Sequence, residues 1–195
     1  MYLKKIAVIL VAGVTSLHAS TVFAVDPASV PEKKRTTLGL YLTSAEAYGV
    51  ATNENVLFVD VRTRAEVNFL GMPTVADANI PYMDLDQFYA WDEGKANYRL
   101  DVNSAFLPAL TQRLEDKGLG KNAKIVLMCR SGDRSAAATN FLAKAGYTNV
   151  YSVVDGYEGD MAKDGPRKGQ RVVNGWRNSD LPWTYKLAKA KMYLD

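Results

Sequence analysis

The chain has 195 residues, of which 48% are hydrophobic and 23% charged, and its formal net charge is +3. This composition is too apolar for a disordered chain and too polar for a protein with several membrane spans. One globular domain is expected, and the small net charge gives no electrostatic reason to predict nucleic acid or an anionic membrane surface as a partner.

The first 24 residues have the pattern of an export signal. Lys4 and Lys5 give a basic start, residues 6–17 are mostly apolar, and a small-x-small cleavage site ends at Ala24. The apolar run is too short for a membrane anchor, and no cysteine follows the cleavage point for lipid attachment. We therefore expect a soluble exported protein, with the bacterial periplasm as its compartment. After cleavage it would begin at Val25 and have a net charge of +1.

Loss of this segment removes His18, the single histidine of the sequence. Ser-His-Asp hydrolysis, Cys-His proteolysis and the common His- or Cys-rich zinc sites are then excluded, which leaves only a carboxylate-bound metal open. The one cysteine, Cys129, has no partner for an internal disulfide, although disulfides are expected in an oxidising compartment. A lone thiol there is either buried or chemically used.

The hydrophobic pattern predicts helices that alternate with strands. A capping box at Thr43–Glu46 marks the first helix, and Gly118 and Gly146 mark the ends of two later ones. In order, we expect a helix at 44–50, a buried strand at 56–59 that ends at Asp60-Val61-Arg62, a helix at 64–70, a strand just before Pro81, a helix carrying Leu107, Leu110 and Leu114 up to residue 117, a strand at 124–128, a helix at 136–145 and a strand at 150–154. This alternation implies an α/β fold with a central, mainly parallel sheet flanked by helices on both faces.

Two segments do not fit the alternation. Residues 82–104 are the least regular part, rich in aromatic and acidic side chains, and are predicted to be an insertion that forms either a satellite core or a lid. The extension at 161–195 holds eight Lys or Arg residues together with Trp176, Trp183 and Tyr185. We expect these aromatics to pack back onto the domain, with a docking surface for a partner protein as the alternative.

The informative segment joins the strand ending at Met128 to the next helix, and its sequence is Cys129-Arg130-Ser131-Gly132-Asp133-Arg134-Ser135. Parallel sheets place ligand sites at the carboxyl ends of their strands, where Cys129 falls. A loop wrapped around the sulfur would direct backbone N–H groups and a helix N-terminus at it, and Arg130 and Arg134 add two positive charges. These features favour the thiolate and would bind a small oxyanion beside it.

Here the chain resembles the rhodanese family of sulfurtransferases, over about residues 38–160. Asp60-Val61-Arg62 with Glu66 is similar to the family's D-V-R-x-x-x-E strand end, Gly71 with Ala78-Asn79-Ile80-Pro81 to its G-H-I…A-x-N-I-P segment, and residues 129–135 to its active-site loop. The resemblance implies that Cys129 carries sulfur as a persulfide, taken from a donor such as thiosulfate and passed to a thiophilic acceptor. It also implies that the loop residues 130–135 bind the donor, with Arg130 and Arg134 on its oxyanion.

The chain departs from the family pattern outside the loop. Met72 replaces the usual His, the segment up to Ala78 is one residue longer, and Asp155-Gly156 replaces Gly-Gly. The resulting organisation is a signal peptide at 1–24, a linker at 25–37, a rhodanese-like domain at 38–160 with the insertion at 82–104, and an extension at 161–195.

Several residues have a structural interpretation beside the functional one. Asp60, Arg62 and Glu66 are expected to be structural near the site, with Arg62 and Glu66 paired on one helical turn. Asp133 is expected to cap the helix that starts near Ser135, or else to offset the charges of Arg130 and Arg134. An inert buried Cys129 is the plain alternative to a catalytic one.

The leading hypothesis is a sulfurtransferase that needs no cofactor and transfers sulfur to a thiol, cyanide or a protein acceptor. A cysteine phosphatase is disfavoured because its loop needs C-x5-R, whereas Arg134 gives C-x4-R. A non-catalytic module that holds an oxyanion or a persulfide for a partner protein is the competing class. A thiol redox sensor is the third.

Overall fold

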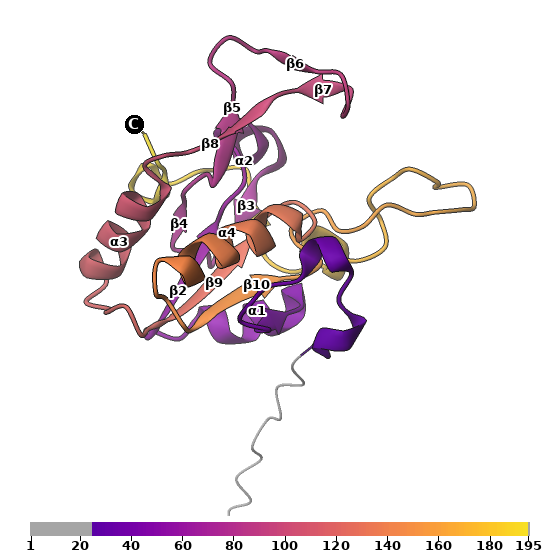
Figure 1. Cartoon of the computed structure of the whole chain (residues 1–195). Coiled ribbons are helices and arrows are strands. Elements are labelled where there is room, and N and C mark those ends of the chain that lie inside the picture. Colours follow the sequence, from indigo (N-terminus) through magenta and orange to yellow (C-terminus); the bar gives the residue numbers. More distant parts are fainter. Residues whose placement is uncertain (1–24, 195) are drawn as a thin grey trace, which may run out of the picture.

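The computed structural model describes residues 25–194 (Figure 1). The predicted signal peptide at 1–24, with His18, lies outside the described residues. Within residues 25–194, no helix combines the length and apolar character needed to cross a membrane.

The centre of the molecule is a sheet of five parallel strands. Its order is β1-β10-β9-β2-β4, and every neighbouring pair is parallel. The strands are β1 (Tyr41–Leu42), β2 (Val56–Asp60), β4 (Ala78–Asn79), β9 (Lys124–Met128) and β10 (Val150–Val153). β2 and β9, in the middle, are buried along almost their whole length, as expected of strands that are covered on both faces. The predicted α/β fold with a mainly parallel sheet is confirmed.

Two helices cover each face of the sheet. Successive side chains of a strand point to opposite faces, so Leu57 and Val59 join one core while Val56 and Phe58 join the other. The first core contains α3 (Phe106–Asp116) and α4 (Asp133–Lys144), and the second contains α1 (Ser44–Ala51) and α2 (Arg64–Leu70). The expected capping box begins α1, where Thr43 accepts from the Glu46 N–H.

The insertion is more regular than the sequence indicates. It forms a two-part antiparallel ribbon that rises at the top of Figure 1, first β5 (Met83–Leu85) with β8 (Leu100–Val102) and then β6 (Trp91–Asp92) with β7 (Asn97–Tyr98). Arg64 of α2 forms an ion pair with Asp84 at 2.7 Å and so ties the ribbon base to the domain. Strands of two or three residues are too short for their alternation to be recognised in a sequence.

The two terminal segments pack against the domain. In the 25–37 segment, which contains the 3-10 helices η1 (Pro27–Ser29) and η2 (Glu32–Lys34), the Lys34 side chain is buried and its Nζ lies 2.8 Å from Asp160. In the extension, β11 (Trp183–Thr184) pairs with β3 (Met72–Pro73), and Trp176 is fully buried in the second core. η3 (Arg177–Ser179) and η4 (Lys189–Lys191) complete the extension.

Candidate active site

The cysteine loop, residues 129–135, lies at the carboxyl end of β9 and leads directly into α4. Cys129 follows the last residue of the strand and is almost completely buried, with 1% of its surface exposed. The Gly132 N–H donates to Cys129 Sγ, with 3.1 Å between nitrogen and sulfur. The loop therefore turns back toward the sulfur, which is the condition on which the expected anion site depends.

Neighbouring backbone fixes the loop from outside. The carbonyl of Cys129 accepts from the Tyr157 N–H at 2.8 Å, and that of Arg130 accepts from Glu158 at 2.9 Å. Within residues 25–194, the N–H groups of Arg130 and Ser131 have no protein acceptor, and α4 begins with the N–H groups that a helix leaves unpaired. Such donors next to a sulfur suit an anion.

Two glycines make this turn possible. Gly132, the N-cap of α4, has φ +100, and a Cβ there would collide with the carbonyl oxygen of Val154. Gly156 has φ +65, and its Cβ would lie 2.6 Å from the nitrogen of Ser131. Both positions require glycine because the segment after β10 and the cysteine loop touch through their backbones.

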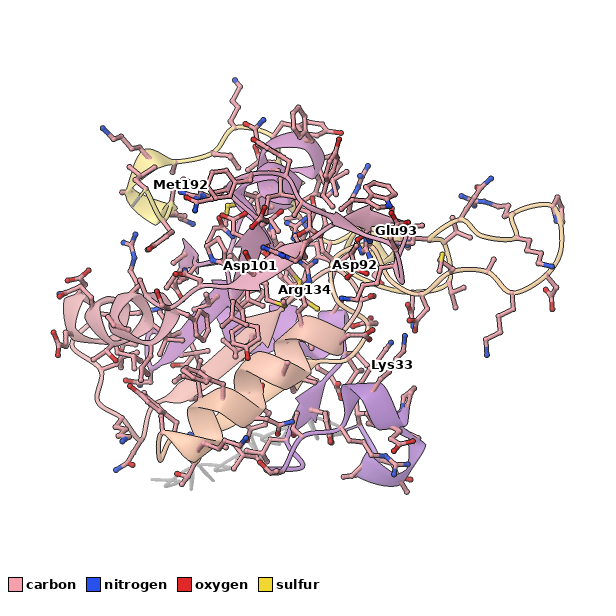
Figure 2. All side chains as sticks on the ribbon, turned by 45° about the horizontal axis from the view of Figure 1, so that its top comes forward. Lys33, Asp92, Glu93, Asp101, Arg134 and Met192 are labelled. Atoms are coloured by element: carbon pink, nitrogen blue, oxygen red, sulfur yellow. The ribbon has the colours of Figure 1, made fainter. Side chains whose placement is uncertain are left out.

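Arg134 lies at the start of α4 (Figure 2). Its side chain is held by Glu66 of α2. The two Nη atoms of Arg134 are 2.7 and 2.6 Å from the two carboxylate oxygens of Glu66. Burial alone would raise the pKa of Glu66, but the hydrogen bonds and charge of Arg134 outweigh it and lower the pKa to about 2. Burial also acts against the positive charge of Arg134, yet Glu66 raises the pKa of that guanidinium above its usual value. Both groups are therefore charged at neutral pH.

Asp60 and Arg62 form a second, fully buried pair at the end of β2. Arg62 Nη2 donates to Asp60 Oδ2 at 2.6 Å and to the Gly71 carbonyl at 2.7 Å, and its guanidinium lies 3.7 Å from the centre of the Tyr157 ring. Desolvation opposes the Arg62 charge, but Asp60 outweighs it, so the net shift in pKa is upward. The predicted Arg62–Glu66 pair is wrong, because α2 begins only at Arg64 and each residue has another partner.

The remaining loop residues face different surroundings. Arg130 is exposed, whereas the Ser135 hydroxyl is buried and donates to the Gly132 carbonyl at 3.0 Å. Asp133 is the first residue of α4, and its carboxylate pairs with Lys33 at 3.2 Å. The expectation that Asp133 caps the helix is therefore wrong: Gly132 occupies the cap, and α4 starts three residues earlier than the alanine run indicates.

The sequence did not identify two contributors to this region. Asp155 is buried behind the loop, where Oδ1 accepts from the Ser44 N–H at 2.8 Å and Oδ2 from the Gly175 N–H at 3.2 Å. Burial raises its pKa despite these donors. Arg171 of the extension lies near Arg130. The sequence shows the departure from Gly-Gly at Asp155 and the basic charge of the extension. It does not show that Asp155 and Arg171 lie near the cysteine loop. In the described part of the chain, no three His, Cys, Asp or Glu side chains gather as a metal site would require.

The model of the family described as "Rhodanese-like domain" matches residues 43–163. An uncharacterized protein of Rickettsia rickettsii, the RP600 homolog, is 31% identical over 145 residues, which cover 74% of this chain and 96% of that protein. RP600 of Rickettsia prowazekii, also uncharacterized, is 30% identical over 146 residues, with the same coverage.

A solved structure shares the fold. The crystal structure of Rv0390 from M. tuberculosis is similar with a TM-score of 0.53 and 27% identity, over 74% of this chain and 96% of that one. The family match spans the cysteine loop, the helices α1 to α4 and four of the five strands of the central sheet; β1 (Tyr41–Leu42) lies just before it. The chain therefore belongs to the family of rhodanese-like domains.

Proposed function

We propose that this protein is a sulfurtransferase in which Cys129 carries the sulfur as a persulfide. The observation that carries the proposal is the placement of Sγ at the end of β9, 3.1 Å from the Gly132 nitrogen and ahead of the α4 N-terminus. A helix N-terminus and converging N–H groups stabilise a thiolate, which is the nucleophilic form of cysteine. Family membership supports the same chemistry.

The first half-reaction takes sulfur from an anionic donor such as thiosulfate. The Cys129 thiolate attacks the outer sulfur of thiosulfate, the sulfur–sulfur bond of the donor breaks, and sulfite leaves with the electron pair. In the second half-reaction an acceptor thiolate, cyanide or a protein thiol attacks the outer sulfur of the persulfide, and Cys129 leaves as the thiolate. The balance needs no cofactor, metal or external oxidant.

The two arginines of the loop have different roles in this proposal. Arg130 is exposed and is proposed to bind the donor's oxyanion directly. Arg134 is engaged by Glu66, so it would supply positive charge near the sulfur and hold the start of α4 in place. We also propose that the protein acts after export, because residues 1–24 have the pattern of a cleaved signal.

The decisive experiment is the intact mass of the protein before and after thiosulfate, with Cys129→Ser alongside. We expect a gain of one sulfur atom in the native protein alone, removed by cyanide or by a thiol. A sulfur that is gained but not released would instead favour the carrier module. No adduct on a reduced and folded protein would refute the persulfide mechanism.

The role of Arg130 is tested by steady-state kinetics with thiosulfate. Replacement Arg130→Gln should raise the KM for thiosulfate about tenfold, because a charge-assisted contact is worth about 1.5 kcal/mol or more, and should change kcat less. Arg130→Lys, which keeps the charge, should recover part of the loss. An unchanged KM in Arg130→Gln would exclude Arg130 from donor binding.

A further inference from the structure

A basic cleft lies beside the cysteine loop; Arg130 and Ser131, which follow Cys129 directly, line it, whereas Cys129 itself does not. The volume of the cleft is about 960 Å³, and three segments line it: η2, the outer side of the cysteine loop, and residues 160–173. We call residues 160–173 the arm; in Figure 1 it is the loop that extends to the right. Arg130, Ser131 and Asp133 are the loop residues that face the cleft.

The arm has a defined backbone structure. The Ala162 N–H donates to the Gln170 carbonyl, and the Gly169 N–H donates to the Ala162 carbonyl, both at 2.9 Å. At its base, the Asn178 side-chain amide donates to the carbonyls of Glu158, Arg171 and Asn174. The wall of the cleft is thus held in position, which reduces the conformational entropy lost when a ligand binds.

Charges in the cleft are only partly neutralised. Lys33 pairs with Asp133, and Lys34 pairs with Asp160. Among the described residues, no carboxylate forms an ion pair with the other four cations of the lining. These four are Arg130, Lys163, Lys168 and Arg171, and the remaining acidic residue of the lining is Asp164. The cleft therefore has an excess of positive charge.

Two of these cations are close enough to oppose each other. Burial lowers the pKa of Arg171 and the positive charge of Arg130 lowers it further, while the carboxylates of Glu158, Asp160 and Asp133 act in the opposite direction without cancelling the shift. Arg171 is fixed near the loop because its Nη1 donates to the Gly159 carbonyl at 2.6 Å. An anion between the two guanidiniums would relieve this repulsion and would be bound by planar donors suited to carboxylates.

We propose that the cleft binds the acceptor of the sulfur, and that this acceptor is a thiol carrying two or more carboxylates. The inference rests on the proposed function for its sulfur chemistry, but the anion site itself does not. The cleft volume is in the range that holds drug-sized ligands, far more than thiosulfate fills. Lys163 and Lys168 are exposed on the arm and extend the positive surface away from Arg130, so a ligand with several anionic groups uses the cleft best.

In the transfer step, the thiolate of the bound acceptor attacks the outer sulfur of the Cys129 persulfide. The sulfur–sulfur bond breaks, its electron pair returns to Cys129 as thiolate, and the acceptor leaves as a persulfide. No oxidant or reductant is consumed. The cations of the cleft would raise the local concentration of the acceptor beside the loop.

The binding test uses mercaptosuccinate, a thiol with two carboxylates, and the Cys129→Ser variant, which cannot form a persulfide. Calorimetry should detect binding at about 0.01 M salt and a loss of most of it at about 1 M, because the Debye length falls from about 30 to about 3 Å. Adding Lys163→Glu and Lys168→Glu should weaken binding about tenfold or more. The control is Lys186→Glu with Lys189→Glu, the same charge change on exposed lysines of the extension that do not line this cleft.

The kinetic test starts from the protein loaded with sulfur by thiosulfate. We compare sulfur release to three thiols: mercaptosuccinate, neutral mercaptoethanol and cationic cysteamine. Each rate is divided by the rate at which the same thiol reacts with a small disulfide in solution, which corrects for its intrinsic reactivity. We expect mercaptosuccinate to lead by about tenfold or more at low salt. The lead should vanish in the arm variant, which here is Lys163→Glu with Lys168→Glu in the protein that keeps Cys129, and persist with the control pair Lys186→Glu and Lys189→Glu in the same protein.

The outcomes separate the two proposals. Equal binding of mercaptosuccinate by the arm variant and the control, or equal corrected rates for the three thiols, would overturn the acceptor site. A protein that forms no persulfide but still binds mercaptosuccinate through the arm would overturn the proposed function and retain the anion site.

Discussion

Glu66 connects the helix α2 to the cysteine loop through Arg134, and each residue of this pair favours the charged form of the other. The carboxylate also accepts from the Thr63 N–H at 2.9 Å, so the same side chain caps α2 and neutralises the guanidinium. The positive charge near Cys129 is therefore positioned by a residue 68 positions away in the sequence. The loop's own residues are adjacent in sequence and were identified from it, whereas this partner required the fold.

Replacement Glu66→Gln is expected to destabilise the protein at neutral pH and much less in acid. A pKa of about 2 in the folded state, against 4.5 as the reference, corresponds to about 3 kcal/mol. Because the folded pKa is lowered, this stabilisation is complete above pH 4.5 and is lost as the pH falls from there toward 2. Urea unfolding of both proteins between about pH 7 and pH 3 measures the difference.

The matched control is Glu46→Gln in α1. Glu46 forms the same kind of capping box with Thr43, but within the described residues no arginine or lysine forms an ion pair with it. Glutamine serves in a capping box, so Glu46→Gln should have little effect. A Glu66→Gln deficit that stays constant from pH 7 to pH 3 would show that the Arg134 pair does not stabilise the fold.

Sequence patterns predicted most of the long elements well, and of the two- and three-residue strands they predicted β4 (Ala78–Asn79), expected just before Pro81, but missed the others. The strands at 56–60 and 124–128 were found because each is a buried apolar run, and the helix at 44–51 because a capping box begins it. The helix at 64–70 was expected because a helix should follow the strand, and its own capping box at Thr63 and Glu66 became evident in the structure. β1 has two residues and exists because Tyr41 and Leu42 pair with Ser152 and Val153 of β10. Such an element is stabilised by its partner strand, so no local signal reveals it.

The insertion illustrates the same limit and supports a prediction of its own. Asp86, at the end of the β5 strand, accepts from the Phe88 and Ala90 N–H groups at 3.1 and 2.9 Å and from Arg99 at 2.7 Å. These bonds fix the turn that leads into β6, although Phe88 itself is 81% exposed. Asp86→Ala should therefore speed amide hydrogen exchange in residues 86–99 without changing that of the central sheet.

The control for this prediction is Glu93→Gln, which removes a negative charge in the turn between β6 and β7 (Figure 2). No hydrogen bond of the Glu93 side chain is found in the described residues, so this variant should exchange like the native protein. Unchanged exchange in Asp86→Ala would mean that the strand pairs alone hold the ribbon.

At the scale of the whole molecule, the extension is part of the core. It crosses the second face of the domain, where Trp176 contacts Phe58 of β2 and Tyr48 of α1, with ring centres 5.5 and 5.9 Å apart. Its backbone continues to β4, an edge strand of the central sheet, where the Tyr193 N–H donates to the Asn79 carbonyl at 3.1 Å. The expectation that the aromatics of the extension pack back onto the domain is confirmed for Trp176, while Tyr185 remains 59% exposed.

Trp176→Ala tests whether the extension stabilises the domain or merely lies on it. Loss of a fully buried indole leaves a cavity between β2 and α1 and removes the Nε1 hydrogen bond to the Pro182 carbonyl, so we expect a cost of about 3 to 5 kcal/mol. Trp91→Ala removes the same side chain from the ribbon, where it is 52% exposed, and should cost about 1 kcal/mol or less. Unfolding in urea compares the two variants with the native protein. The arm beside Arg130 belongs to the same extension as Trp176. A large loss of stability in Trp176→Ala would therefore mean that the extension, which forms a wall of the cleft, unfolds together with the domain. Equal, small effects of the two tryptophans would mean that the extension does not stabilise the domain.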